Sequence, residues 1–188
     1  MDQAESTFMK LIHQRRSTRA FSTQPVEPEK IMKCLEAARL APSACNSQPW
    51  HFIIVDDAAL CKQLAEETLL PLTSMNQFTK DAPAFVVIVT EPSNIASGLA
   101  AIVKKINYRL IDIGIAALQF CLRAEELGLG TCMLGWFQQK KVKKLLAIPQ
   151  SKGCNLIIAI GYPKEHKANS VNRKVLEQIY SRNRYGQK

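Results

Sequence analysis

The order of helical and strand-like segments predicts an α+β protein in which a sheet is covered by helices. Short apolar runs that suit buried strands are separated by segments whose apolar residues recur at helical spacing, without a strict strand–helix–strand repeat. We therefore expect more helix than strand. The 188 residues contain no Gly/Ser linker, repeat or low-complexity tract, so they predict a single domain over residues 1–188.

Five segments have the apolar spacing of helices, and four apolar runs predict strands. Proline suits the first turn of a helix and stops a helix that precedes it, which sets several of the helix boundaries. We expect helices around 8–12, from Pro28 to just before Pro42, over 57–70, over 108–127 and over 138–146. We expect strands over 51–55, 85–89, 131–136 and 155–160.

The segment over 108–127 is apolar nearly all round. Ile111, Ile115, Leu118 and Leu122 share one face, and further apolar residues extend that surface around the helix. In a small protein, a helix that is buried on several sides indicates a subunit interface. Two glycines at 128 and 130 then end this helix.

Composition narrows the class of protein. Lys and Arg number 25 against 16 Asp and Glu, which gives a net charge of +9 and favours an anionic partner: nucleic acid, membrane surface or a phosphate-bearing cofactor. The six cysteines show no CxxC spacing and no clustered histidine, so zinc and redox-dithiol sites are unsupported. The polar amino terminus does not resemble a signal peptide, and no run approaches the ~18 apolar residues of a membrane span. We expect a reduced, cytoplasmic, soluble protein.

A basic turn follows the first expected helix. Arg15, Arg16, Ser17, Thr18 and Arg19 place three guanidiniums and two hydroxyls within five residues. Guanidinium forks and hydroxyl donors suit a phosphate monoester. The alternative is a solvated basic turn that complements the dipole at a helix carboxyl end.

A polar loop of small residues lies between the second helix and the first strand. Residues 41–50 read Ala-Pro-Ser-Ala-Cys-Asn-Ser-Gln-Pro-Trp, so uncharged donors and acceptors stand between two stiffening prolines. Such a loop fits the rim of a flat heteroaromatic ligand. The alternative is an ordinary helix-to-strand connection, with Asn and Ser present for turn chemistry.

The glycines near residue 130 are not a nucleotide-binding fingerprint, because they follow a long helix and precede a strand. Gly135 differs, since a glycine inside a strand often marks the close approach of a ligand or backbone. No Ser/His/Asp triad is legible, and the thiol of Cys45 has no neighbouring base in the sequence. If the chain is an enzyme, a cofactor should carry the chemistry.

Four motifs together resemble the nitroreductase family of FMN-dependent oxidoreductases. In chain order they are residues 15–21 (RRSTRAF), 41–52 (APSACNSQPWHF), 127–137 (LGLGTCMLGWF) and 160–163 (IGYP). The first two motifs together are specific, and the resemblance covers nearly the whole chain. It implies an intertwined homodimer with a mostly antiparallel sheet between helices, and two FMN sites at the interface, each built from both chains.

The resemblance also implies a reaction. NAD(P)H would reduce FMN by hydride transfer, and an acceptor would then take the electrons in a ping-pong sequence. Acceptors in the family include nitroaromatics, quinones and free flavins. No side chain is expected to act as the catalytic acid, base or nucleophile.

The family's binding residues can be carried over by position. Arg15, Arg16 and Ser17 would hold the FMN phosphate, with Arg19 near the pyrimidine end of the ring, where a cation would stabilise the reduced flavin. Further residues with implied roles are Arg182 and Arg184 at the phosphate, Pro42, Ser43, Ala44 and Asn46 against the flavin of the partner subunit, and Leu134 and Gly135 with backbone near N5. The family's mid-chain Asn could be Asn76, but its register is open.

Some positions depart from the family pattern, and other functions stay open. Ala44 replaces a serine, Leu134 replaces an acidic residue of some members, and the short segment over 85–107 argues against dehalogenating or ring-fragmenting chemistry. A flavin-binding protein without turnover is one alternative. A nucleic-acid-binding module is another, motivated by the basic run over 140–144, but no recognition motif accompanies it. The physiological acceptor and the choice of NADH or NADPH are not legible.

Overall fold

The computed structural model describes residues 6–69, 73–92, 106–164 and 172–187. Its strands are β1 (Trp50–Val55), β2 (Ala84–Thr90), β3 (Gly130–Leu134) and β4 (Gly153–Gly161). Its α-helices are α1 (Thr7–Gln14), α2 (Pro28–Arg39), α3 (Ala58–Thr68), α5 (Tyr108–Glu126) and α6 (Gln139–Leu145). Short 3-10 turns are η1 (Ala44–Asn46), η2 (Gln77–Asp81) and η3 (Leu176–Gln178).

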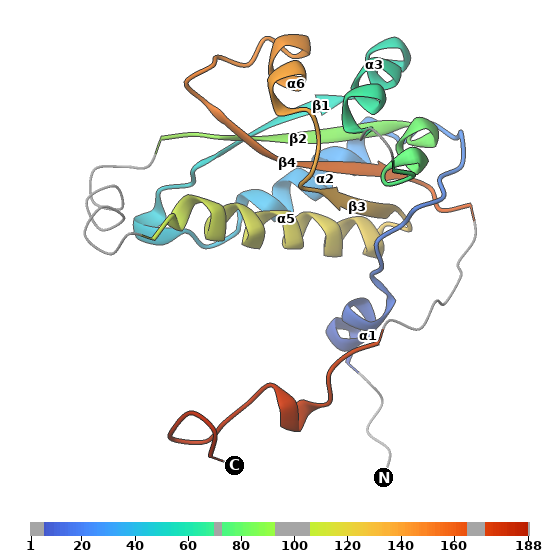
Figure 1. The fold of residues 1–188 in the computed structure, drawn as a ribbon. Coiled ribbons are helices and arrows are strands. Elements are labelled where there is room, and N and C mark those ends of the chain that lie inside the picture. Colours follow the sequence, from blue (N-terminus) through green and yellow to red (C-terminus); the bar gives the residue numbers. More distant parts are fainter. Residues whose placement is uncertain (1–5, 70–72, 93–105, 165–171, 188) are drawn as a thin grey trace.

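The strands form one antiparallel sheet in the order β1-β2-β4-β3, with helices on both faces (Figure 1). Every residue of β2 is buried, and its side chains alternate between the two faces. Val86 and Ile88 pack with Phe120 on the face of α2 and α5. Phe85 and Val87 belong to the second core, on the face of α3 and α6. The predicted α+β architecture and antiparallel sheet are confirmed, and helix exceeds strand within the described residues.

One strand boundary differs from the prediction in a way that affects the site. The strand expected over 131–136 ends at Leu134, where its pairing with Ile157 of β4 is the last of the ladder. Gly135 and Trp136 lie beyond the sheet, and the Trp136 carbonyl bonds instead to the Asn76 side chain. Strand β4 itself continues from Ile157 to Gly153, so β3 ends because its chain leaves the sheet at Gly135, and periodicity alone overestimates the length of the strand.

Helix α5 buries one face and exposes the other. The buried face packs on the sheet and α2 and consists of Asp112, Ile113, Ala116, Ala117, Phe120, Cys121 and Ala124. On the outer face, Ile111 is 53% exposed and Leu118 is 46% exposed. The apolar face that the sequence indicated as a subunit interface is therefore left open by a single chain.

Both terminal segments are also poorly buried. Helix α1 has no buried residue, and Phe8 at its start is 61% exposed. Every residue of the carboxyl-terminal tail, defined as residues 172–187, is exposed, and the tail extends away from the sheet beyond α1 (Figure 1). Its apolar residues include Leu176 and Ile179, each 64% exposed, and Tyr185, which is fully exposed. Such exposed apolar surface is unusual in a monomer.

The end of β4 is packed too tightly for a side chain at Gly161. A Cβ there would lie 2.6 Å from Pro83 Cδ and 3.0 Å from Phe21 Cδ1. We expect Gly161→Ala to lower the free energy of unfolding by about 1–3 kcal/mol through overpacking. Thermal unfolding followed by circular dichroism measures this effect. Ala147→Gly is a control of opposite sign, because Ala147 holds a left-handed φ of 53° that glycine adopts without strain. A Gly161→Ala protein that unfolds at the wild-type temperature would contradict this packing.

Candidate functional site

The basic segment, residues 15–19, is held along the start of β3. Arg15 caps α1, and its N–H still donates to the Leu11 carbonyl. The chain then runs beside β3, where Ser17 forms a parallel bridge with Thr131 and the Thr18 N–H donates to the Thr131 carbonyl at 2.9 Å. A glycine at position 130 of β3 permits this approach, since a Cβ there would lie 2.8 Å from the Thr18 Cβ.

The chain after the basic segment is anchored in the same way. Phe21 is fully buried and bridges Pro163, and the Ser22 N–H donates to the Tyr162 carbonyl at 2.8 Å. The Lys164 N–H donates in turn to the Ala20 carbonyl at 2.9 Å. The basic segment is therefore fixed against the sheet at both of its ends, which a freely solvated turn would not need.

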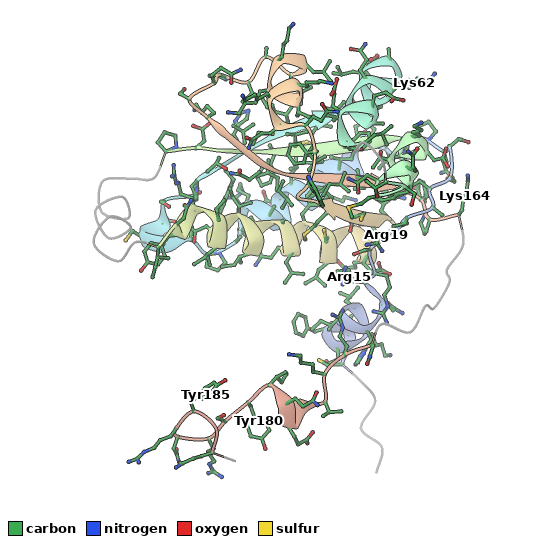
Figure 2. The ribbon with its side chains drawn as sticks, in the orientation of Figure 1. Arg15, Arg19, Lys62, Lys164, Tyr180 and Tyr185 are labelled. Atoms are coloured by element: carbon green, nitrogen blue, oxygen red, sulfur yellow. The ribbon has the colours of Figure 1, made fainter. Side chains whose placement is uncertain are left out.

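The guanidiniums of this segment bond mostly to nearby backbone. Arg16 Nη1 donates to the Arg15 carbonyl at 3.0 Å, and Arg19 Nη1 to the Ser17 carbonyl at 3.5 Å. Arg16 Nε is buried without a hydrogen-bond partner among the described residues. Figure 2 shows Arg15 and Arg19 near each other below the end of the sheet. Because a guanidinium carries several N–H donors, most of them remain for an anionic ligand.

Nearby cysteines are kept in the thiol form despite these cations. Burial raises the pKa of Cys121 to about 11, and the positive charge of Arg15 offsets only part of that rise. Burial likewise raises the pKa of Cys132, against the opposing charges of Arg19 and Arg15. Neither thiol is a thiolate at neutral pH, so neither is a nucleophile in this arrangement.

The site loop, residues 42–49, has a strained backbone. Cys45 and Asn46 both have φ of 51°, and Gln48 has φ of 44°. Each non-glycine residue in this left-handed region costs on the order of 1 kcal/mol. Such strain persists where surrounding contacts determine the conformation, and it is common in loops that hold ligands.

Hydrogen bonds fix this loop from within and from α5. Ser43 Oγ accepts from the Gln48 N–H at 3.0 Å, and the Ala44 carbonyl accepts from the Ser47 N–H at 3.1 Å. The Ala44 N–H donates to Asp112 Oδ1 at 3.1 Å. The backbone N–H and carbonyl of Ala44 therefore both have partners within the chain. Sequence reasoning missed Asp112, although a carboxylate within the apolar stretch over 110–122 was a usable signal.

One chain does not bring the site loop and the basic segment together. The loop is bonded to Asp112 near the start of α5. Arg15 instead lies near Cys121, farther along the helix, where its positive charge opposes the rise that burial causes in the pKa of that thiol. These two helix residues are nine positions apart, which is about 14 Å of helix rise. The predicted site residues form two groups at different places along α5, an arrangement that suits a site shared by two chains.

The backbone that follows β3 is exposed at Gly135, and the space beside it is open. Leu134 is 3% exposed, so its side chain belongs to the core and only its backbone can face a ligand. Gly135 is exposed, and a Cβ there would meet nothing within 4 Å. Asn76 supports this segment: its Nδ2 donates to the Trp136 carbonyl at 3.1 Å and to the Thr68 carbonyl at 3.0 Å. Both amide hydrogens of Asn76 are therefore used within the chain.

The tail arginines lie apart from the basic segment. The Arg184 N–H donates to the Arg182 carbonyl at 2.8 Å within a tight, exposed turn. Tyr180 and Tyr185 of the same tail are well separated from Arg15 in Figure 2. A single chain therefore does not assemble all of the predicted phosphate ligands.

The described residues contain neither a metal-binding cluster nor a membrane-spanning helix. No group of three or more His, Cys, Asp and Glu side chains there is placed to hold a metal ion. None of the helices in those parts of the chain has the length and apolarity to cross a membrane.

Comparison with known proteins decides the family. Residues 12–162 match the nitroreductase family, a range that includes the basic segment, the site loop and β3. The chain belongs to the nitroreductase family. It is an oxidoreductase of the nitroreductase type, and the resemblance that the four motifs predicted is confirmed.

Relatives of this chain carry several names. A protein of Archaeoglobus fulgidus, provisionally named NADH dehydrogenase/NAD(P)H nitroreductase, is 33% identical over 85% of this chain and 87% of its own. An iodotyrosine deiodinase of Thermotoga neapolitana is 25% identical over 88% of this chain and 94% of its own. The crystal structure of an FMN-dependent nitroreductase from Clostridium difficile is 28% identical and superposes with a TM-score of 0.77, covering 94% of this chain and 99% of that one.

Proposed function

We propose that this single-domain protein is an FMN-dependent oxidoreductase that passes electrons from NAD(P)H to nitroaromatic, quinone or similar acceptors by a ping-pong mechanism, as a homodimer. The observation that carries the proposal is the arrangement around β3. Guanidiniums suited to a phosphate are fixed beside its first residues, and the open Gly135 stands just beyond its last. The relatives named as nitroreductases support the same activity.

The residues present fit FMN. The phosphate of FMN is a dianion, and Arg15, Arg16 and Ser17 would hold it with charge-assisted hydrogen bonds. Arg16 Nε, buried without a partner among the described residues, is a donor of the required kind. A flat ring needs a surface without side chains, which Gly135 supplies. When bound, FMN would supply the hydride chemistry.

Each group on the chain then has a defined task. Arg19 would place a cation at the pyrimidine end of the ring, where it favours the reduced, more negative form. Asn76 holds the Trp136 carbonyl and so fixes the direction of the backbone that presents Gly135. Pro42, Ser43, Ala44 and Asn46 would line the flavin site of the partner subunit.

The dimer is part of the proposal because the site is incomplete without it. The outer face of α5 exposes Ile111 and Leu118, which a two-fold related copy would cover. The same contact would bring the site loop of one chain toward the basic segment of the other. Arg182 and Arg184 would complete the phosphate site once the exposed tail is bound.

Bleaching of the bound flavin tests the activity. We expect the purified protein to be yellow and to lose its visible absorbance when NADH or NADPH is added without oxygen. Addition of a quinone should then restore the colour with turnover. A yellow protein that neither donor bleaches would be a flavin-binding protein without turnover, and a colourless protein that ignores added FMN would overturn the proposal.

The phosphate assignment predicts the effect of a double substitution. Arg16→Ala with Arg184→Ala removes two cationic donors, each worth about 1.5–3 kcal/mol, so the FMN dissociation constant should rise by roughly 100-fold or more. Flavin fluorescence titration measures the constant, and sedimentation should still show a dimer. The matched control is Arg39→Ala with Lys144→Ala, which makes the same charge change at exposed positions on α2 and α6. Native flavin content in the Arg16/Arg184 variant would contradict the assignment.

The interface assignment predicts that a charge on the outer face of α5 separates the subunits. Leu118→Lys should convert the dimer into monomers, because a lysine there would have to be desolvated between two apolar surfaces. Analytical ultracentrifugation gives the mass directly. Lys140→Glu on α6, which lies on the opposite face of the sheet, is a control that should leave the dimer intact. A Leu118→Lys dimer of wild-type affinity would place the interface elsewhere.

A further inference from the structure

The carboxylate of Asp112 is a buried charged group for which the proposed reaction has no use. Asp112 lies on α5, is 4% exposed and accepts the Ala44 N–H through Oδ1 at 3.1 Å. Its Oδ2 is buried without a hydrogen-bond partner among the described residues. Because a buried carboxylate is unfavourable unless it is bonded, its position beneath the site loop calls for a physical reason.

The site loop supplies that reason, since its conformation needs a restraint from outside. Cys45 and Asn46 follow Ala44 directly, and both hold left-handed φ values that non-glycine residues adopt only under constraint. Ala44 is the first residue of η1, so a bond to its N–H fixes the point at which the left-handed stretch begins. A hydrogen bond to a carboxylate is roughly twice as strong as one between neutral groups. Helix α5 is the longest helix described and gives this bond a rigid base.

We propose that Asp112 is the positioning residue of the site loop. Its carboxylate holds the Ala44 N–H against α5 and thereby keeps Cys45 and Asn46 in the conformation that faces the flavin site. In this role Asp112 would act on flavin binding through the loop that it holds. The link to flavin binding rests on the proposed function, whereas the effect on the loop does not.

Cys45 provides a reporter of loop position that requires no flavin. Cys45 is exposed, whereas the other five cysteines are buried. Burial also raises the pKa of Cys34 to about 12 and that of Cys154 to about 11, so these thiols react slowly at neutral pH. The rate of modification by a disulfide reagent such as DTNB therefore reports Cys45, and Cys45→Ser should remove the fast phase.

The test compares three variants of the full-length protein. Asp112→Ala removes the acceptor and should change the rate of Cys45 modification by at least about fivefold and weaken FMN binding about tenfold, as expected for the loss of a hydrogen bond to a charged group. Asp112→Asn keeps one acceptor oxygen for the Ala44 N–H, so it should rescue both values to within about threefold of wild type. Ile113→Val, which trims a neighbouring core residue of α5, should leave both values unchanged even where it lowers the melting temperature.

Ala44→Pro removes the same hydrogen bond from its other partner. Proline has no N–H, it is favoured in a first helical position, and the extended Ser43 (φ −145°, ψ 154°) suits the residue before a proline. This variant should reproduce the Cys45 rate of Asp112→Ala, and combining the two should change the rate no further. It also keeps the test open if Asp112→Ala does not fold.

The outcomes separate the inference from the proposed function. Wild-type Cys45 rates in Asp112→Ala or Ala44→Pro would overturn the positioning role, as would an Asp112→Asn protein as impaired as Asp112→Ala. If Cys45 responds as expected but the wild-type protein binds no FMN, the proposed function fails and the positioning of the loop stands. If FMN binds equally well to every variant, the loop does not control the flavin site and the inference fails.

Discussion

The rest of the structure depends on the two-sided packing of α5. Its inner face covers the sheet together with α2, and Phe120 and Ala116 on that face are fully buried. Its outer face presents Ile111 and Leu118 to solvent in a single chain. Because the exposure of a contiguous apolar face is unfavourable, the same helix that organises the fold also favours assembly. The core and the proposed interface are therefore two sides of one element.

The position of β3 at the edge of the sheet explains why the site lies there. An edge strand has unpaired backbone groups, and the chain at Ser17 and Thr18 occupies part of that edge with a bridge and a hydrogen bond to Thr131. The edge is thus protected by a segment that carries three arginines. At the other end the ladder stops at Leu134, and Gly135 leaves backbone exposed. The proposed FMN site needs both a phosphate cradle and uncovered backbone, and the candidates for them lie at the two ends of this one strand.

The sequence predicted the elements well and the connections between them poorly. Strands such as 85–89 and the helix over 108–127 follow from apolar periodicity, because burial of one or both faces leaves a direct trace in residue order. The bond from Ala44 to Asp112 joins residues 68 positions apart, and the amide of Asn76 reaches Trp136 across 60 positions. Neither contact has a local signature. The candidate ligands came from motifs, but their division into two groups along α5 depends on tertiary packing and could not be read from spacing.

A site divided between two copies links cofactor binding to assembly. If the site loop of one chain and the basic segment of another enclose the same FMN, each bound flavin stabilises the dimer by mass action, and a loss of dimer weakens flavin binding by the same free energy. The strained backbone at Cys45 and Asn46 fits this linkage, because a loop already fixed from α5 loses little further entropy when ligand and partner arrive. Asp112 thus lies on the helix that organises the fold and carries the proposed interface, and it holds the loop proposed to line the flavin site.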